Sequence, residues 1–191
     1  MGDDAPGRDV LLTGLRAGGQ QAEAARAELA FPGGDASAEE RERSAARRAE
    51  VSMLLAASLR PTDKPLARWL LEQEIAAHEA VGRDASETLF TLVAAVARYA
   101  DPDDVLLLWR ARQATPETRT GVDVEQVFRG GVERVRRRLQ TLTRQQGVRA
   151  REAAEALEWL ESGVSLGAAE DLPGYFAWAD ERFGLHISGP T

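Results

Sequence analysis

Two successive stretches of the chain carry the same order of helix signals and large aromatic residues. Each has a tryptophan in its first half and a phenylalanine in its second: Trp69 and Phe90, then Trp109 and Phe128. A capping residue followed by a proline marks a helix start before each tryptophan. The capping residue is Thr62 before Trp69 and Asp101 before Trp109. Alternating β-branched runs bounded by turns, which would predict strands, are absent from the sequence. The chain is therefore predicted to be all-α and built from antiparallel helical hairpins.

The two tryptophans are 40 residues apart and the two phenylalanines 38. This period resembles that of HEAT and armadillo repeats, in which each helix pair buries its apolar face by stacking on a neighbour. The resemblance implies a short α-solenoid-like array, with two pairs in residues 62–143 and a degenerate C-terminal pair in residues 147–185. A closed helical bundle would produce the same pattern and stays open as the alternative. Residues 1–60 add N-terminal helices that are partly polar, and residues 1–191 are expected to form one domain.

Capping and breaking residues set the expected helix ends. Gly18-Gly19 divides the N-terminal segment into two short helices, and Ser37 with Glu40 opens a helix that reaches about Arg60. The polar first half of that helix is expected at the surface. Residues 115–121 are expected to form a loop within the second pair. Gly130-Gly131 falls inside the following helical pattern, where each glycine costs up to about 1 kcal/mol relative to alanine. We therefore expect a neighbouring helix to approach closely there.

Composition excludes several classes of site. The chain has no cysteine, which excludes disulfides, thiolate metal ligands and cysteine nucleophiles. The sequence has no apolar run long enough for a secretory signal or a membrane span, so a cytoplasmic location is the simplest interpretation. Neither a P-loop nor a strand-linked dinucleotide-binding glycine motif occurs. The formal net charge of −7 argues against general affinity for nucleic acid.

Histidine offers the one candidate for metal or proton chemistry. The chain has two histidines, and His78 follows Glu74 by one helical turn, so that this pair could hold a metal ion or share a proton. A di-metal bundle would need several such pairs on different helices, and the sequence has no second one. We therefore interpret His78 as a partly buried histidine beside the apolar stripe of Leu71 and Ile75. No catalytic residue, metal or cofactor is expected.

One segment carries a net charge opposite in sign to that of the rest of the chain. Residues 129–151 contain eight arginines and one acid, Glu133, so the segment carries +7 and the remaining residues carry −14. Such segregation can attract phosphate or an acidic partner. We favour internal pairing of these arginines with acidic helices packed alongside. Arg134, Arg137 and Arg138 are the candidates for an exposed binding face.

The second candidate site surrounds the second tryptophan. Tryptophans 69, 109, 159 and 178 are expected mainly as core residues, although an open array could turn one of them toward its concave side. Polar connections carried by rigid helices commonly bind ligands. The candidate binding residues of this region are Trp109, Arg110, Arg112, Glu117, Arg119 and Asp123.

Two functions remain open at this level. The leading hypothesis is a non-enzymatic cytosolic interaction or scaffold module that presents a groove and an arginine-rich helix to another protein, possibly an acidic one. The alternative is a helical small-molecule or anion-binding regulatory protein that uses a tryptophan-lined pocket with Arg110, Arg112 or Arg119. A protein-binding groove should be open and extended, whereas a ligand pocket should enclose most of a small molecule. The oligomeric state stays open.

Overall fold

The computed structural model of the chain describes residues 8–82, 86–162 and 172–186. These residues contain α-helices and two short 3-10 helices but no strand, which confirms the predicted all-α class. The 3-10 helices are η1 (Pro61–Asp63) and η2 (Pro102–Asp104). The α-helices are α1 (Arg8–Ala17), α2 (Gly19–Leu29), α3 (Ala38–Ala57), α4 (Lys64–Val81), α5 (Glu87–Ala97), α6 (Val105–Gln113), α7 (Pro116–Gly121), α8 (Val124–Val127), α9 (Val132–Thr143), α10 (Val148–Glu161) and α11 (Leu172–Arg182).

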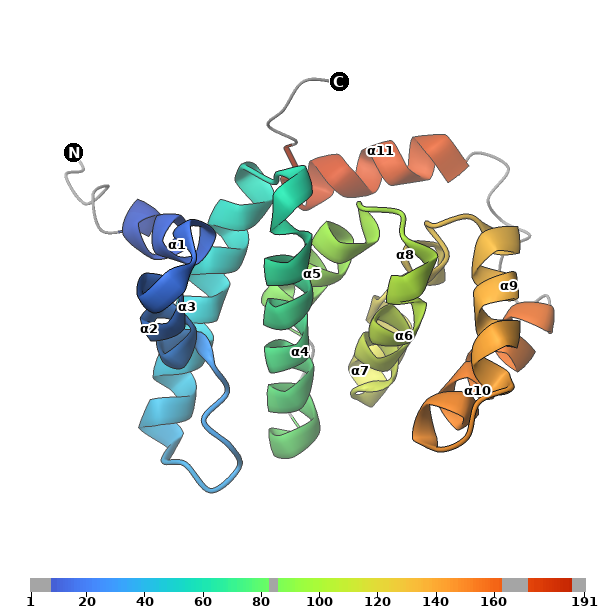
Figure 1. The fold of residues 1–191 in the computed structure, drawn as a ribbon, viewed down its shortest axis with the longest axis horizontal. Helices are drawn as coiled ribbons and strands as arrows, with labels where there is room; N and C mark the ends of the chain where they lie inside the picture. The colour runs from blue at the N-terminus through green and yellow to red at the C-terminus, as the bar shows by residue number, and fades with distance from the viewer. Residues whose placement is uncertain (1–7, 83–85, 163–171, 187–191) are drawn as a thin grey trace.

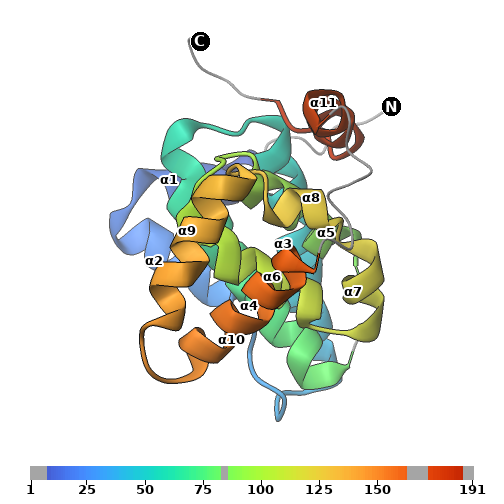
Figure 2. The same cartoon turned by 90° about the vertical axis from the view of Figure 1, so that its right-hand side faces the viewer.

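The helices cross the molecule in the order of the chain (Figure 1). Helices α1 to α3 lie at one end, α4 and α5 follow, then α6 to α8, and α9 and α10 lie at the other end. α11 runs across the tops of the other helices, and Figure 2 shows it end-on, outside them. One apolar cluster extends from Leu12 in α1 to Leu160 in α10 and Leu185 after α11. Each group of helices thus contributes to a single core.

The predicted helix ends are confirmed in the N-terminal third. Gly18 and Gly19 have φ of 77° and 63°, values that glycine adopts at little cost, and the chain turns there between α1 and α2. The Ser37 hydroxyl accepts from the Glu40 N–H at 3.2 Å, and the Glu40 carboxylate accepts from the Ser37 N–H at 3.0 Å. This capping box fixes the start of α3.

The first half of α3 is not only a surface element, which corrects the expectation for this helix. Ser44 and Arg48 are buried, and Arg48 has no exposed side-chain surface. The reason is that Glu74 of α4 faces Arg48 and accepts its Nε–H at 2.7 Å. A charged residue can be buried when a partner of opposite charge is buried with it.

The second helix pair differs from the prediction in two places. Residues 116–121 form the short helix α7 instead of a loop, because Thr115 and Thr118 cap each other reciprocally and Pro116 starts the first turn. The prediction of a continuous helix through Gly130-Gly131 is wrong as well. The chain breaks after α8, and Gly131 has a φ of 93° before α9 begins.

The expected close approach at the two glycines is made by a turn instead of a helix. A Cβ added to Gly130 would lie 3.2 Å from the carbonyl oxygen of Ala100 and 3.2 Å from the nitrogen of Pro102. The break after α8 lets α9 pack along α10, and α10 in turn contacts α6. Trp159 of α10 is thereby brought to Trp109 of α6, with ring centroids 6.0 Å apart.

α11 is fastened to the other helices by polar contacts. Asp180 accepts two hydrogen bonds from Arg129, at 2.6 and 2.8 Å, and forms an ion pair with Arg98 at 2.9 Å. The Tyr175 hydroxyl donates to Asp123 at 2.7 Å. Beyond α11, the His186 N–H donates to the carbonyl of Ala56 at 2.9 Å, and the rest of the expected tail, residues 187–191, lies outside the described residues.

Candidate functional site

Helix α9 and the first turn of α10 expose a row of arginines. The spacing of Val135, Leu139 and Leu142 turns one side of α9 into the core, so that the other side faces solvent. Among the described residues no carboxylate forms an ion pair with the exposed arginines of this region. We call them the arginine face: Arg134, Arg137, Arg144, Arg149 and Arg151.

The remaining arginines of the basic segment are paired. Arg129 is bound to Asp180, Arg136 pairs with Glu133 one turn before it, and Arg138 lies 2.7 Å from Asp103. Internal pairing therefore holds for these three arginines but is wrong for the five of the arginine face. Asp180 of α11 and Asp103 of η2 pair with Arg129 and Arg138 from neighbouring elements, whereas Glu133 pairs within α9.

A groove between α4, α6 and α10 adjoins the arginine face. It has a volume of about 650 Å³, and Arg149 contributes to its wall. The apolar part of the groove comprises Leu106 and Leu107 of α6 with Val148, which is 59% exposed. The polar part has both charges and includes Arg110, whose Nη2 lies 3.4 Å from both carboxylate oxygens of Glu79. We call it the α4–α10 groove.

The predicted site around Trp109 forms a second groove on α6, α7 and α10. Trp109 is 4% exposed, and its ring meets Trp159 at an angle of 54°. Phe128 stacks on Trp159, with ring centroids 6.0 Å apart and an angle of 16° between the ring planes. The guanidinium carbon of Arg112 lies 5.8 Å from the Trp109 centroid and 5.2 Å from the Trp159 centroid. Cation–π attraction therefore fixes Arg112 over both indoles.

We call this hollow the tryptophan–arginine groove; its volume is about 530 Å³. Its lining residues are Trp109, Arg112, Gln113, Arg119, Glu155, Glu158, Trp159 and Ser162. Arg119 of α7 donates its Nε–H to Gln113 at 2.9 Å. Burial, and then the neighbouring charge of Arg119, lower the pKa of the Arg112 guanidinium. Two like charges thus share one hollow.

Two donors of this groove have no acceptor in the described part of the chain. The Nε of Arg112 and the indole Nε1 of Trp109 are both buried without a hydrogen bond. Glu155 and Glu158 of α10 line the same groove, but neither forms an ion pair with Arg112 or Arg119. An unpaired buried donor costs free energy, so this arrangement is more typical of a binding surface than of a finished core.

The candidates predicted around Trp109 do not form one site. Trp109, Arg112 and Arg119 come together, whereas Arg110 points into the α4–α10 groove. Asp123 is engaged with Tyr175 of α11, and Glu117 is exposed on α7. The sequence reasoning missed Trp159, Gln113 and the two acids of α10, because it placed α10 in a separate third pair. The only local signal was the spacing of three between Trp109 and Arg112, which puts both on one side of a helix.

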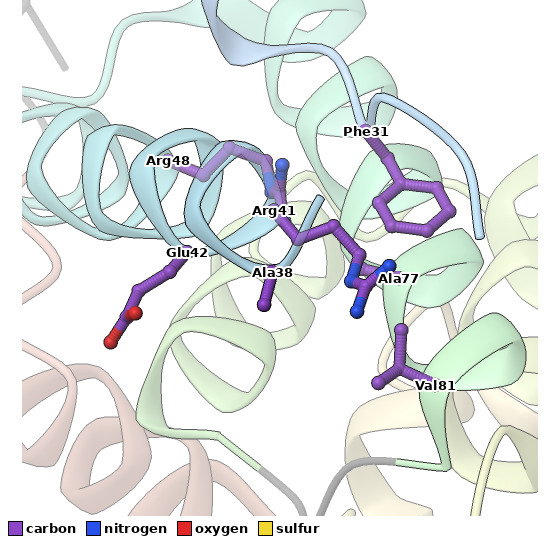
Figure 3. A pocket seen from close by; sticks show the side chains of 7 residues that line it. All are labelled: Phe31, Ala38, Arg41, Glu42, Arg48, Ala77 and Val81. Atoms are coloured by element: carbon purple, nitrogen blue, oxygen red, sulfur yellow. The ribbon is translucent and has the colours of Figure 1, made fainter. Parts of the chain in front are cut away.

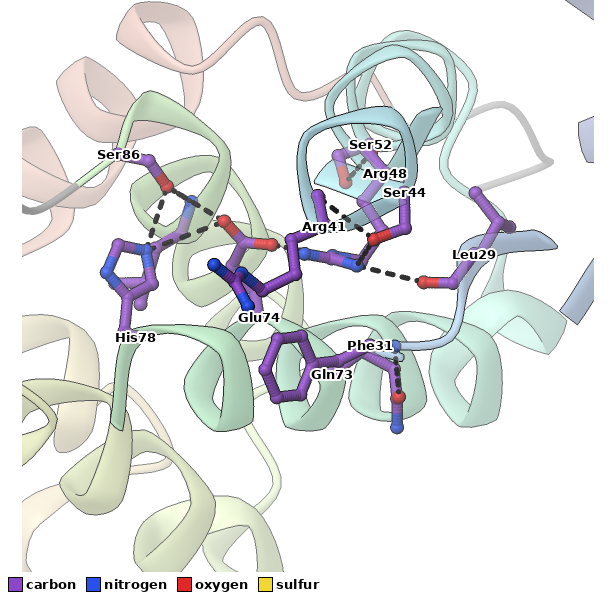
Figure 4. A network of polar contacts seen from close by, with 11 residues as sticks. Leu29, Phe31, Arg41, Ser44, Arg48, Ser52, Gln73, Glu74, His78 and Ser86 are labelled. Carbon is purple, nitrogen blue, oxygen red and sulfur yellow. Dashed lines mark hydrogen bonds and ion pairs between the residues drawn. The ribbon is translucent and has the colours of Figure 1, made fainter. Parts of the chain in front are cut away.

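A network of buried polar groups joins α3, α4 and α5 (Figure 4). Arg48 donates to Glu74 at 2.7 Å and to the Leu29 carbonyl at 3.1 Å. Ser86, which caps α5, donates to the other oxygen of Glu74 at 3.0 Å and lies 3.1 Å from Nε2 of His78. Burial raises the pKa of Glu74, but the hydrogen bond from His78, the charge of Arg48 and its hydrogen bond outweigh burial and lower that pKa to about 2. Glu74 is therefore ionised at neutral pH.

This network does not have the geometry of a serine hydrolase triad. In such a triad the histidine accepts the serine proton on one ring nitrogen and donates to the carboxylate with the other. Here Ser86 gives its only proton to Glu74, and the same Nε2 of His78 faces Ser86 at 3.1 Å and Glu74 at 3.5 Å. One ring nitrogen thus faces both groups, whereas a triad uses the two nitrogens of the ring for the serine and the carboxylate separately. His78 is 1% exposed, so the expected partly buried histidine is in fact fully buried.

A cavity of about 160 Å³ lies beside the network (Figure 3). Arg41 reaches across it toward Phe31 and Val81, and Arg48 forms its inner wall. The Nη1 group of Arg41 already donates to the carbonyls of Gly34 and Ala36. The cavity is small and its two arginines are engaged, so it is a weaker candidate than the tryptophan–arginine groove.

Comparison with known proteins identifies no relative: no family model matches the chain, and no curated protein or solved structure matches it significantly. No group of three or more potential metal ligands occurs among the described residues. Within the same residues, no helix is both long and apolar enough to cross a membrane. Function must therefore be argued from the two surfaces described above.

Proposed function

We propose that this protein is a non-enzymatic interaction module that binds an acidic segment of another protein along the arginine face, with an apolar residue of that segment on the apolar part of the adjoining α4–α10 groove. The observation that carries the proposal is the set of five exposed arginines that form no ion pair with any carboxylate of the described residues. An acidic partner would supply the missing charges.

The shape of the surface favours a protein segment over a small molecule. The α4–α10 groove is broad, and its apolar residues lie next to Arg149. Protein interfaces combine an apolar centre with a polar rim, and Val148 with the arginine face provides both. The −14 carried by the remaining residues would repel a long polyanion such as nucleic acid, whereas a short acidic segment touches only the basic end.

A fluorescein-labelled peptide of ten residues, rich in glutamate and containing one leucine, is a suitable probe for anisotropy titration. The test variant is Arg134→Glu with Arg137→Glu. Each exposed ion pair contributes about 0.2–1 kcal/mol, and reversal replaces attraction by repulsion. We therefore expect the affinity to fall by about tenfold or more, where tenfold corresponds to about 1.4 kcal/mol. Binding to the wild-type protein should weaken as salt is added.

The matched control is Arg43→Glu with Arg60→Glu, which changes the net charge by the same amount at exposed positions far from the arginine face. The control should bind the probe like the wild-type protein. Equal losses in both double variants would mean that net charge alone attracts the peptide. The absence of saturable binding to the wild-type protein, or tighter binding of duplex DNA of equal charge, would refute the proposed function.

A further inference from the structure

The tryptophan–arginine groove is separate from the arginine face and has a different chemistry. Its cations are Arg112 and Arg119, and its floor consists of Trp109 and Trp159. It adjoins the second half of α10, whereas Arg149 and Arg151 belong to the first turn of that helix. What this groove binds can therefore be argued independently of the proposed function.

Neither arginine of the groove forms an ion pair with a carboxylate of the described residues. Arg112 is half-buried and forms no hydrogen bond or ion pair within the described part of the chain. Arg119 is the charged neighbour that acts on it, and the two guanidinium groups repel each other. An anion placed between them would remove this repulsion and supply acceptors for both.

The stacking of Arg112 prepares it for an oxyanion. The guanidinium group lies over two indole rings, so its plane is held by the protein before any ligand arrives. Its Nε is buried, which leaves the terminal Nη1 and Nη2 groups for contact with a ligand. Two coplanar N–H groups match the two oxygens of a carboxylate or two oxygens of a phosphate. A stacked guanidinium also loses little further side-chain freedom when the ligand binds.

We infer that the tryptophan–arginine groove is a binding site for a small organic oxyanion, whose carboxylate or phosphate group is held between Arg112 and Arg119. The amide of Gln113 orients Arg119 from the other side. A volume of about 530 Å³ is within the range of about 300–1,000 Å³ that is usual for small-molecule sites. Glu155 and Glu158 line the same groove and would repel a ligand with several anionic groups, so the site favours a molecule with one anionic group.

The four tryptophans allow a test within a single molecule. In ¹⁵N–¹H spectra the indole signals of Trp109 and Trp159 report on the groove, whereas those of Trp69 and Trp178 lie outside it and serve as internal controls. The probes are benzoate and phenyl phosphate, titrated at constant ionic strength, with benzyl alcohol as the uncharged control. We expect saturable shifts of the first two signals with at least one of the anions. The relative affinities of benzoate and phenyl phosphate decide between a carboxylate and a phosphate.

Three variants distinguish a specific anion-binding site from nonspecific attraction of anions to the protein. Arg119→Gln removes the guanidinium group of an exposed side chain, so the fold should stay intact. Anion binding should weaken by about tenfold or more. Arg112→Lys keeps the charge but loses the planar pair of donors, and it should also weaken binding. Arg110→Gln removes a neighbouring charge outside the groove and should change nothing.

Three outcomes would overturn the inference. The first is that no anion gives saturable shifts of the Trp109 and Trp159 signals. The second is that all four indole signals move together, which would indicate a general salt effect. The third is that Arg110→Gln weakens binding as much as Arg119→Gln does. None of these measurements involves the arginine face. A negative result for the tryptophan–arginine groove would therefore not refute the proposed function, and a negative result for the arginine face would not refute the anion site.

Discussion

Replacing Arg48 with methionine tests whether the buried network holds α3 against α4. The substitution keeps a long apolar stem but removes the guanidinium group, so Glu74 loses the donor that lies 2.7 Å from its Oε2. The carbonyl of Leu29 loses a donor at 3.1 Å as well. Glu74 is only 5% exposed, so its carboxylate has little contact with solvent that could replace these bonds.

The size of the effect follows from the asymmetry of buried ion pairs. Removing one partner of such a pair costs about 3–5 kcal/mol, because a charge is left buried without compensation. His78 and Ser86 still contact the other oxygen of Glu74, which favours the lower half of that range. In a protein of this size, 1 kcal/mol shifts Tm by about 2–4 °C. We therefore expect the Tm of Arg48→Met to fall by about 10 °C.

The assays are thermal denaturation, which gives Tm, and urea denaturation, which gives the free energy of unfolding, both followed by far-UV circular dichroism at pH 7 for Arg48→Met, for Glu74→Gln and for the double variant. Once Arg48 is absent, the uncharged glutamine is less costly to bury than the carboxylate, so the double variant should be more stable than Arg48→Met alone. A loss below about 1 kcal/mol for Arg48→Met would refute the reasoning, since it is below the usual cost of an unsatisfied buried group. A double variant whose loss equals the sum of the two single losses would show that the two residues do not interact.

Three further predictions concern other parts of the fold. Glu74 has a pKa near 2 when folded against 4.5 as its ordinary value, so its contribution to stability is full above pH 4.5 and is lost as the pH falls toward 2; urea denaturation between pH 7 and pH 3 should show a flatter decline for Glu74→Gln. Gly131→Ala should cost about 1–3 kcal/mol, because its φ is 93°, whereas Gly34→Ala should be nearly neutral in the same measurement. Asp180→Asn weakens the contacts with Arg98 and Arg129, so amide hydrogen exchange should accelerate in α11 and not in α4; unchanged exchange would mean that apolar contacts alone hold α11.

Local signals in the sequence were sufficient for the helix class and for most helix ends. The capping box of Ser37 and Glu40 and the glycines at 18 and 19 act within one or two turns, so their effect can be read from neighbouring residues. Residues 115–121 carried a signal of the same kind, since Thr115, Pro116 and Thr118 are a capping sequence. The polar composition of this segment predicts a loop, but the reciprocal cap outweighs it and a short helix forms.

Long-range contacts could not be read in this way. Gly130 approaches the turn at Ala100 across 30 residues of sequence, and a break in the helical pattern appears only when that turn is in place. The same break decides that α9 packs on α10 and that Trp159 meets Trp109. The candidate site around Trp109 was therefore predicted with three correct members but without its second wall.

The distribution of ion pairs explains why both proposed surfaces lie at one end of the molecule. In the N-terminal half, arginines meet acids on neighbouring helices, as Arg16 does with Asp63 and Arg47 with Glu28. At the other end, Asp103 and Asp180 pair with Arg138 and Arg129, and no described carboxylate forms an ion pair with the arginine face. A ligand or a partner could supply the anions for these arginines. Selection for stability alone would favour acids beside these arginines, because exposed like charges repel each other. Within the described residues, the arginines of the arginine face form no ion pair and Nε of Arg112 has no acceptor, and this is the argument that this end of the molecule binds.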